Sequence, residues 1–378
     1  MHPPYPSTSV SRRRFLGQVT AAGALALAPR WALAAGTDQP RKKLGVVLVG
    51  LGSYAGDRLA PALQNTQHCR LVGVVTGNPE KGRKWAAKYG FPEQSIYGYG
   101  TMDRMATNPD IDVVYVVTPN SLHAQHCIAA AKAGKHVITE KPMATSVEDC
   151  DAMIAACKAA GVRLMVGYRL HYEPHTAEMC RIARDRDFGP FMKITGENGF
   201  AIWPEARPQT VWRLDKKLAG GGPLMDMGVY VVQAVCMTKA EASPVAVTAK
   251  FDPVTMPDVF SEVEQSLQWT MEFADGAVAH CRASYVNQWS SLRADAAGGW
   301  VELPYPAFYY DEPLLNTSRG PVERPLVNHQ EAQLDGMALE IAGKLPSLAP
   351  GEMGRRDIAI TTAIYAAARS GGRVAVQA

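Results

Sequence analysis

The sequence predicts an α/β fold, with a doubly wound parallel sheet in its first half and an α+β domain with a large, mainly antiparallel sheet in its second half. Three observations predict this fold. Short apolar runs alternate with helical stretches over residues 44–167, as in a parallel sheet covered by helices. A glycine-rich turn follows the first apolar run. From residue 168 onward the segments are longer and their apolar residues alternate, which indicates antiparallel strands.

An export leader precedes the predicted fold. Arg12, Arg13 and Arg14 are followed by a short, Ala-rich apolar stretch, and Ala32-Leu33-Ala34 supplies the small residues of a cleavage site. This pattern predicts a twin-arginine signal peptide over residues 1–34, which sends a folded protein through the Tat export machinery to the bacterial periplasm. An ordinary secretory signal is the alternative. Residues 35–43 then form a short N-terminal arm.

Charge and composition exclude several classes of protein. The chain of 378 residues has a net charge of +3, but residues 1–34 hold four Arg and no acid, so the remainder carries 3 − 4 = −1. A nearly neutral chain lacks the excess of positive charge that binding to nucleic acid requires. No segment after the leader has 18 uninterrupted apolar residues, so we expect no membrane span in the mature protein.

The seven cysteines are odd in number and follow no disulfide or Cys-x-x-Cys spacing, so we expect buried thiols. His123, His126 and Cys127 cluster on one Ala-rich helical stretch. Because no second ligand group has metal-site spacing, the sequence predicts no metal site.

The elements of the first domain, residues 44–167, follow in a regular order. Leu44–Val49 is continuously apolar, as expected of a strand that is buried on both faces. The predicted strands are 44–49, 71–75, 113–117, 136–139 and 163–166, and the predicted helices are 57–65, 81–89, 124–133 and 147–160.

A dinucleotide-binding turn joins the first strand to the first helix. Its sequence is Gly50-Leu51-Gly52-Ser53-Tyr54-Ala55, in which Ala55 replaces the usual third glycine. That position needs only a small side chain, and the strand–turn–helix context is the one that the motif requires. We therefore predict a Rossmann domain that binds a nicotinamide cofactor through Gly50, Leu51, Gly52, Ser53 and Tyr54, with the pyrophosphate at the helix N-terminus.

The end of the second strand predicts NADP rather than NAD. NAD enzymes usually place a carboxylate there, whereas this chain has Thr76-Gly77-Asn78, followed by the basic residues Lys81, Arg83 and Lys84. We expect Thr76, Gly77 and Lys81 to contact the 2′-phosphate. Alternatively, the basic residues form only a solvated helix face.

The second domain, residues 168–378, is predicted to contain the large sheet. Its expected strands are 192–199, 245–251, 262–273 and 277–286, with a hairpin turn at Asp275-Gly276. One face of this sheet would pack on helices, and the other could pair with a second subunit. The helical stretch 357–369 is expected to pack back on the first domain.

Several motifs carry a resemblance to a known family. They are Thr118–His123, Ala133–Pro142 with its Glu140-Lys141-Pro142, Gly167–Tyr172, Trp212–Leu214 and Leu218–Tyr230. Through them the chain resembles the glucose–fructose oxidoreductase, inositol dehydrogenase and rhizopine-catabolism (Gfo/Idh/MocA) family from about residue 44 to the C-terminus. Within the family it is most similar to the periplasmic glucose–fructose and aldose–aldose oxidoreductases.

The resemblance implies an activity and a set of site residues. It implies hydride transfer between sugars through tightly bound NADP, oxidation of an aldose at C1 to the lactone, reduction of a second sugar to the alditol, and a homodimer or homotetramer. It implies further cofactor contacts at Thr118, Asn120, His123, Glu140, Lys141, Arg169, Trp212 and Arg213. It implies a catalytic group of Lys141, Asp226 and Tyr230, which together with Tyr172 would contact the substrate.

Tyr230 is the predicted acid/base. A free tyrosine has a pKa of about 10 and is a poor base near neutrality, so it needs a nearby cation, for which Lys141 is the candidate. Asp226 lies four residues before Tyr230, which places both on one face of a helix. Without the resemblance, Tyr230 would be interpreted as a core tyrosine and Asp226 as a residue that starts a helix. Lys141 would be interpreted as a loop lysine beside Pro142. Much of the family has His where this chain has Tyr230.

Two departures from the pattern keep other interpretations open. Glucose–fructose oxidoreductase has a long proline-rich arm, but residues 35–43 contain one proline, Pro40, so the resemblance does not extend to arm exchange and the choice between dimer and tetramer stays open. The segment 200–209 also differs from the family pattern and could shape the sugar pocket differently, so fructose is not implied as the acceptor. A glycosidase of the same fold that uses NAD is one alternative, which the missing carboxylate argues against. A sugar–NADP sensor without catalysis is another, which the intact Lys141, Asp226 and Tyr230 argue against.

Overall fold

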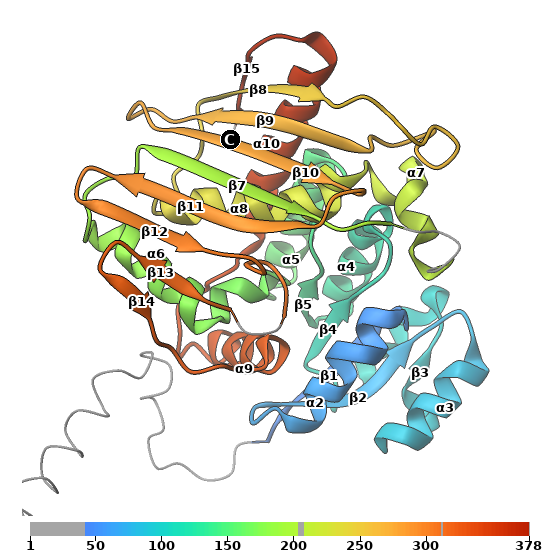
Figure 1. The fold of residues 1–378 in the computed structure, drawn as a ribbon. Coiled ribbons are helices and arrows are strands. Elements are labelled where there is room, and N and C mark those ends of the chain that lie inside the picture. Colours follow the sequence, from blue (N-terminus) through green and yellow to red (C-terminus); the bar gives the residue numbers. More distant parts are fainter. Residues whose placement is uncertain (1–41, 203–207, 311–312, 378) are drawn as a thin grey trace, which may run out of the picture. The chain divides into compact units, whose positions relative to one another are not determined.

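A computed structural model describes residues 42–202, 208–310 and 313–377 of the protein (Figure 1). The predicted leader and the arm up to Arg41 lie outside the described residues. Residues from Lys42 onward form one compact unit. No helix in these ranges is long and apolar enough to cross a membrane.

Six parallel strands form the first sheet, in the order β3-β2-β1-β4-β5-β6. Sheets of this doubly wound order place ligands beyond the carboxyl ends of their strands. The strands are β1 (Leu44–Val49), β2 (Cys69–Val75), β3 (Ile96–Tyr97), β4 (Val113–Val116), β5 (His136–Thr139) and β6 (Leu164–Val166).

Helices alternate with these strands, and their bounds lie close to those expected. Asn78 caps α3, because its side chain accepts a hydrogen bond from the backbone N–H of Lys81, and Ser146 caps α5 in the same way through Asp149. The helices are η1 (Ala55–Leu59), α2 (Ala60–Asn65), α3 (Pro79–Tyr89), η2 (Glu93–Ser95), η3 (Tyr99–Thr107), η4 (Asn120–Leu122), α4 (His123–Lys132) and α5 (Val147–Ala159).

Nine strands form the second sheet, in the order β14-β13-β12-β11-β7-β10-β9-β8-β15. All pairs are antiparallel except β7 with β10. The strands are β7 (Lys193–Gly199), β8 (Ala246–Phe251), β9 (Ser266–Glu272), β10 (Val278–Ser284), β11 (Trp289–Ala296), β12 (Gly299–Leu303), β13 (Leu315–Thr317), β14 (Gly320–Val322) and β15 (Val374–Ala375). The fold class predicted from the sequence is confirmed.

One face of the second sheet is covered by helices, with α8 and α10 lying against it in Figure 1. Helix α10 also packs on α5 and β6 of the first sheet, as expected for the last helix. The helices that follow β6 in the chain are η5 (Arg169–Tyr172), α6 (Pro174–Asp185), η6 (Pro208–Leu214), α7 (Lys216–Ala219), η7 (Leu224–Gly228), α8 (Val229–Thr238), α9 (His329–Ile341) and α10 (Gly351–Ser370).

One predicted strand is too long. The sequence indicates a strand over residues 262–273, but β9 begins only at Ser266. The carboxylate of Glu264 accepts hydrogen bonds from the backbone N–H groups of Gly222 and Leu224, so this residue contacts the start of η7. The alternation of apolar residues in the sequence cannot show whether a residue pairs in a strand or, like Glu264, binds a helix start through its side chain.

Candidate active site

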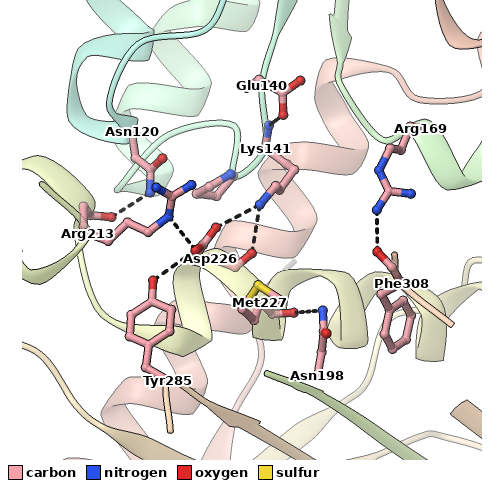
Figure 2. Close-up of polar contacts among 12 residues, drawn as sticks. Asn120, Glu140, Lys141, Arg169, Asn198, Arg213, Asp226, Met227, Tyr285 and Phe308 are labelled. Atoms are coloured by element: carbon pink, nitrogen blue, oxygen red, sulfur yellow. Dashed lines mark hydrogen bonds and ion pairs between the residues drawn. The ribbon is translucent and has the colours of Figure 1, made fainter. Parts of the chain in front are cut away.

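A cavity of about 720 Å³ lies where the carboxyl ends of the parallel strands face η7 and α8. Its walls include the segments that follow β1, β4, β5 and β6, together with residues of η6, η7 and α8. Figure 2 shows the polar contacts of its central residues. The cavity therefore occupies the place where sheets of this order bind ligands.

The glycine turn forms the wall after β1, and Gly50, Leu51, Gly52, Ser53 and Tyr54 all line the cavity. Gly50 has φ +93°, and a Cβ on it would stand 2.9 Å from the carbonyl oxygen of Val117. A Cβ on Gly52 would meet no protein atom within 4 Å, so the absent side chain leaves open space beside the backbone. The turn thus fits a pyrophosphate group that approaches the backbone closely.

Thr76, Gly77 and Lys81 lie beside this turn but do not line the cavity. The Thr76 hydroxyl accepts a hydrogen bond from the backbone N–H of Asn78. The Lys81 ammonium donates to the carbonyl oxygen of Leu51, at 2.5 Å. An ammonium group therefore stands at the edge of the glycine turn, next to the end of β2.

The segment after β4 contributes Thr118, Asn120 and His123 to the lining. The side-chain amide of Asn120 donates to the carbonyl oxygen of Ala219, at 2.9 Å. The ring nitrogens of buried His123 lie 2.8 Å and 3.0 Å from the carbonyl oxygens of Thr118 and Pro142. Burial lowers the pKa of His123. The ring therefore lies between two loops of the first domain, and in its neutral form it can donate a hydrogen bond to only one of these two carbonyl oxygens.

Glu140 lies at the end of β5 and also lines the cavity. Its carboxylate accepts hydrogen bonds from the Tyr115 hydroxyl, at 2.7 Å, and from the backbone N–H of Lys141, at 3.3 Å. Burial raises the pKa of Glu140, against the opposing effects of the Tyr115 hydrogen bond and of the Lys141 and Arg169 cations.

Lys141 and Asp226 join the two domains inside the cavity. The Lys141 ammonium donates to the carboxylate of Asp226, at 3.0 Å, and to the backbone carbonyl oxygen of the same residue, at 2.9 Å (Figure 2). Burial by itself lowers the pKa of Lys141, but Tyr230, Asp226 and Glu140 raise it more, so the net pKa lies above its usual value.

The second oxygen of the Asp226 carboxylate accepts from Arg213, at 2.8 Å, and from the Tyr285 hydroxyl, at 3.1 Å. Burial would raise the pKa of Asp226, but Arg213 and Lys141 hold it well below its usual range. Asp226 is therefore an ionised carboxylate with donors on both oxygens, and its direct partners are protein groups.

Tyr230 lines the cavity one turn beyond Asp226. The Lys141 ammonium lies 4.6 Å from the centroid of its ring, and the Arg169 guanidinium lies 5.3 Å from it. The structure thus brings together Lys141, Asp226 and Tyr230, which the sequence placed 85 and 4 residues apart.

Arg169, Trp212 and Arg213 also line the cavity. The buried guanidinium of Arg169 donates to the carbonyl oxygen of Phe308, and another of its nitrogens lies 2.9 Å from Nδ1 of His329. The Arg213 guanidinium lies over the Trp212 ring, 4.6 Å from its centroid.

Tyr172 does not reach the cavity, so its placement gives no support to the predicted contact with substrate. Its hydroxyl donates to the carboxylate of Glu340, at 2.7 Å, and its ring packs against Gly336. The short helix η5 turns Arg169 toward the cavity and Tyr172 toward α9. Arg169 and Tyr172 therefore belong to one sequence motif but lie in different environments, the first in the cavity wall and the second against α9.

The sequence analysis did not identify several residues that line the cavity or contact the carboxylate of Asp226. Phe308, Tyr309 and Tyr310 are consecutive, and such an aromatic group in a loop is a signal that could have drawn attention. Tyr285 carries no such signal, because it lies just beyond β10 and reaches Asp226 only through the fold. No group of three or more side chains that could hold a metal ion occurs among the described residues.

Comparisons with known proteins agree with this architecture. Residues 44–168 match the model of an oxidoreductase family with an NAD-binding Rossmann fold, and residues 176–299 match the GFO/IDH/MocA C-terminal domain. The structure is similar to that of aldose–aldose oxidoreductase from Caulobacter crescentus, at 39% identity and a TM-score of 0.83, over 88% of this chain and 100% of that one.

Two curated relatives are similar over most of their length. D-xylose 1-dehydrogenase [NADP(+)] from Haloarcula marismortui is 26% identical, over 90% of this chain and 94% of its own. 1,5-Anhydro-D-fructose reductase from Ensifer adhaerens is 26% identical, over 86% and 96%. Because both family models match in order along the chain, the chain belongs to the Gfo/Idh/MocA family of oxidoreductases.

Proposed function

We propose that this protein is an NADP-dependent oxidoreductase that transfers a hydride from one sugar to another. The observation that carries the proposal is the meeting of Lys141, Asp226 and Tyr230 in the cavity that the glycine turn also lines. The proposed proton-transfer group and the predicted cofactor-binding turn thus line the same cavity. When bound, the nicotinamide supplies the redox chemistry by accepting a hydride from one substrate and giving it to the next.

In this proposal Tyr230 is the acid/base. It takes the proton of the C1 hydroxyl as the C1 hydride leaves the aldose, which becomes the lactone. It then returns that proton to the carbonyl oxygen of a second sugar, which becomes the alditol. Lys141 donates toward the reacting oxygen and keeps a positive charge beside Tyr230. Asp226 positions Lys141 and holds the counter-charge.

The walls of the cavity suit a sugar. Phe200, Trp212, Phe308 and Tyr309 line it, and aromatic faces can pack against the apolar face of a sugar ring while nearby polar groups bind its hydroxyls. Three of the similar proteins reported above are named for sugar substrates. An aldose donor, glucose-like in size, is therefore proposed, with an aldose or fructose as acceptor.

Cofactor choice is proposed from the end of β2. Thr76 stands where NAD enzymes usually carry a carboxylate, and the Lys81 ammonium lies at the glycine turn. A 2′-phosphate would find the Lys81 ammonium there, and Thr76 in place of the carboxylate that would repel it.

The predicted leader supports a periplasmic location and a cofactor that is retained after export. Retention for about 10⁴ s, at an association rate near 10⁶ M⁻¹s⁻¹, requires a dissociation constant of about 10⁻¹⁰ M. Two sugars that use one cavity in turn would give ping-pong kinetics. The outer face of the nine-stranded sheet is proposed to pair with a second copy of the chain.

The proposal is tested with protein purified without added nucleotide. We expect roughly one NADP per chain, as the dissociation constant above requires. Adding an aldose alone should reduce this nucleotide, and adding a second sugar should reoxidise it. Tyr230→Phe should keep the nucleotide but lose turnover by roughly 10²–10⁴-fold, the usual contribution of an acid/base group.

Two results would overturn parts of the proposal. Protein that arrives empty and needs NADP for each turnover would be an ordinary sugar dehydrogenase. Near-normal turnover by Tyr230→Phe would remove Tyr230 from the acid/base role.

A further inference from the structure

A run of three glycines, Gly220-Gly221-Gly222, precedes the helix that carries Asp226 and Tyr230. All three have a neighbour too close for a side chain, and for two of them this neighbour is Tyr365 or Glu264. A Cβ on Gly221 would stand 2.0 Å from the hydroxyl oxygen of Tyr365, and one on Gly222 would stand 2.4 Å from the carbonyl oxygen of Glu264. The glycine run is thus the place where Glu264 and Tyr365 contact the backbone directly.

The carboxylate of Glu264 holds the start of this helix. One oxygen accepts from the backbone N–H of Gly222, at 3.0 Å, and the other accepts from that of Leu224, at 3.1 Å. The Tyr365 hydroxyl on α10 donates to the same carboxylate, at 2.7 Å. Helix starts leave backbone N–H groups without partners, and here one side chain satisfies two of them.

The first domain contacts the same segment from the other side. The Asn120 amide, in the cavity wall after β4, donates to the carbonyl oxygen of Ala219. A Cβ on Gly220 would stand 2.6 Å from Cγ2 of Thr145, which lies four residues beyond Lys141. Residues 219–222 therefore lie between the loops that carry the cofactor and the pair formed by Glu264 and Tyr365.

We propose that Glu264 and Tyr365 are positioning residues of this oxidoreductase. They hold residues 222–224 in place and thereby set the position of Asp226 and Tyr230 relative to Lys141, which comes from the first domain. The inference rests on the proposed function, in which Lys141 and Tyr230 act together. Neither Glu264 nor Tyr365 lines the cavity, so they act through the helix rather than on the substrate.

The expected effect follows from geometry. A shift of about 1 Å in a reacting group can cost roughly 10²-fold in rate, even when the substituted residue is remote from the chemistry. In Glu264→Gln, one of the two backbone N–H groups faces an amide N–H donor instead of a carboxylate oxygen. The start of the helix must then move or leave that group unpaired.

The test compares Glu264→Gln with Glu340→Gln. Glu340 is a matched control, because its carboxylate also accepts from a tyrosine hydroxyl, that of Tyr172, and from a backbone N–H, that of Leu348, but neither partner belongs to the helix that carries Asp226 and Tyr230. We expect Glu264→Gln to lower the rate at which an aldose reduces the bound nucleotide by about 10–100-fold, with KM changed less than about threefold. The kinetic isotope effect with C1-deuterated aldose should increase, because hydride transfer becomes slower than product release.

A measurement independent of activity accompanies the rates. Hydrogen exchange should become faster in peptides that cover residues 219–230 of Glu264→Gln and should stay unchanged there in Glu340→Gln. If both variants reduce the bound nucleotide equally fast, the inference is wrong. If Glu264→Gln does not fold, Tyr365→Phe decides: a loss of about 3–10-fold at constant KM supports the inference, and a wild-type rate overturns it.

Failure of the proposed function would look different. In that case Tyr230→Phe would itself reduce the nucleotide at the wild-type rate, whatever the result for Glu264. A slow Tyr230→Phe together with a wild-type rate in Glu264→Gln would instead remove only the positioning role.

Discussion

Asp226 is held by side chains from three separate parts of the chain: Lys141 after β5, Arg213 in η6 and Tyr285 just beyond β10 (Figure 2). The side chain is almost fully enclosed, at 10% exposure, so its charge is balanced by these groups rather than by water. Its role is therefore to fix the positions of two cations.

Replacing Asp226 by Asn should destabilise the protein by about 3–5 kcal/mol at pH 7, because two cations lose their buried partner. The folded pKa of Asp226 lies below its unfolded value, so this contribution is present above about pH 4 and is lost as the pH falls further. Urea unfolding of both proteins at pH 7 and near pH 3 measures the difference, which should be smaller at the lower pH. A variant as stable as the wild type at pH 7 would contradict the assignment.

Lys81 is the residue that should decide cofactor preference. Lys81→Ala should reduce the preference for NADP over NAD by roughly 10–100-fold, since a hydrogen bond between charged groups contributes about 1.5–3 kcal/mol. Dissociation constants of NADP and NAD for protein stripped of nucleotide provide the measurement. Lys84→Ala, on the same helix α3, is the control, because the Lys84 side chain pairs with Glu80. An unchanged preference in Lys81→Ala would leave Lys81 as part of a solvated helix face.

Among the elements, the helix from Leu224 to Thr238 has a start that is held by a side chain distant in sequence, that of Glu264. It opens with a π-helical turn, η7, and continues as α8, whose residues are all buried. Gly228 lies against the second sheet, where a Cβ would stand 3.3 Å from the Trp269 ring. The helix is thus fixed along its length by the sheet and at its start by Glu264.

Gly221→Ala should destabilise this element. The added Cβ would overlap the Tyr365 hydroxyl at 2.0 Å, and overpacking of this kind usually costs about 1–3 kcal/mol or more. Gly100→Ala is the matched control, because no atom lies within 4 Å of the Cβ that it adds. Urea unfolding midpoints should fall for the first variant alone. If Gly221→Ala and the wild type have equal midpoints, the prediction is wrong, because Tyr365 on α10 would then move aside at no measurable cost.

In the molecule as a whole, burial of histidines links stability to pH. His126, His171 and His329 each have a pKa lowered to about 4, with burial as the largest cause. For His329 the adjacent Arg169 cation adds to the effect of burial. Each should therefore be neutral in the folded protein at neutral pH.

The unfolded chain binds protons at these histidines near pH 6.5, whereas the folded chain does so near pH 4. Stability should consequently fall as the pH drops through this window. His329→Gln removes one titrating group but keeps an oxygen that can accept from Arg169, so its Tm should fall less steeply between pH 6.5 and 4. Thermal unfolding at several pH values checks this, with the exposed His280→Gln as control. Parallel curves for His329→Gln and wild type would contradict the prediction.

The sequence by itself determined the fold class and much of the cavity wall. Continuous apolar strands and the turn at Gly50–Tyr54 are local signals, because a strand buried on both faces and a backbone that approaches a phosphate each restrict the residue types nearby. The family motifs also identify Lys141, Asp226 and Tyr230 as members of one site.

Only the tertiary structure decided which partners these residues have. Tyr285 and Glu264 meet the helix of Tyr230 through contacts between segments far apart in the chain, and such contacts leave no periodic pattern in the sequence. Tyr172 shares a motif with Arg169 yet faces α9, because the backbone of η5 turns the two side chains to different sides. Local patterns fix which elements form, whereas the packing of one domain on the other fixes where their side chains point.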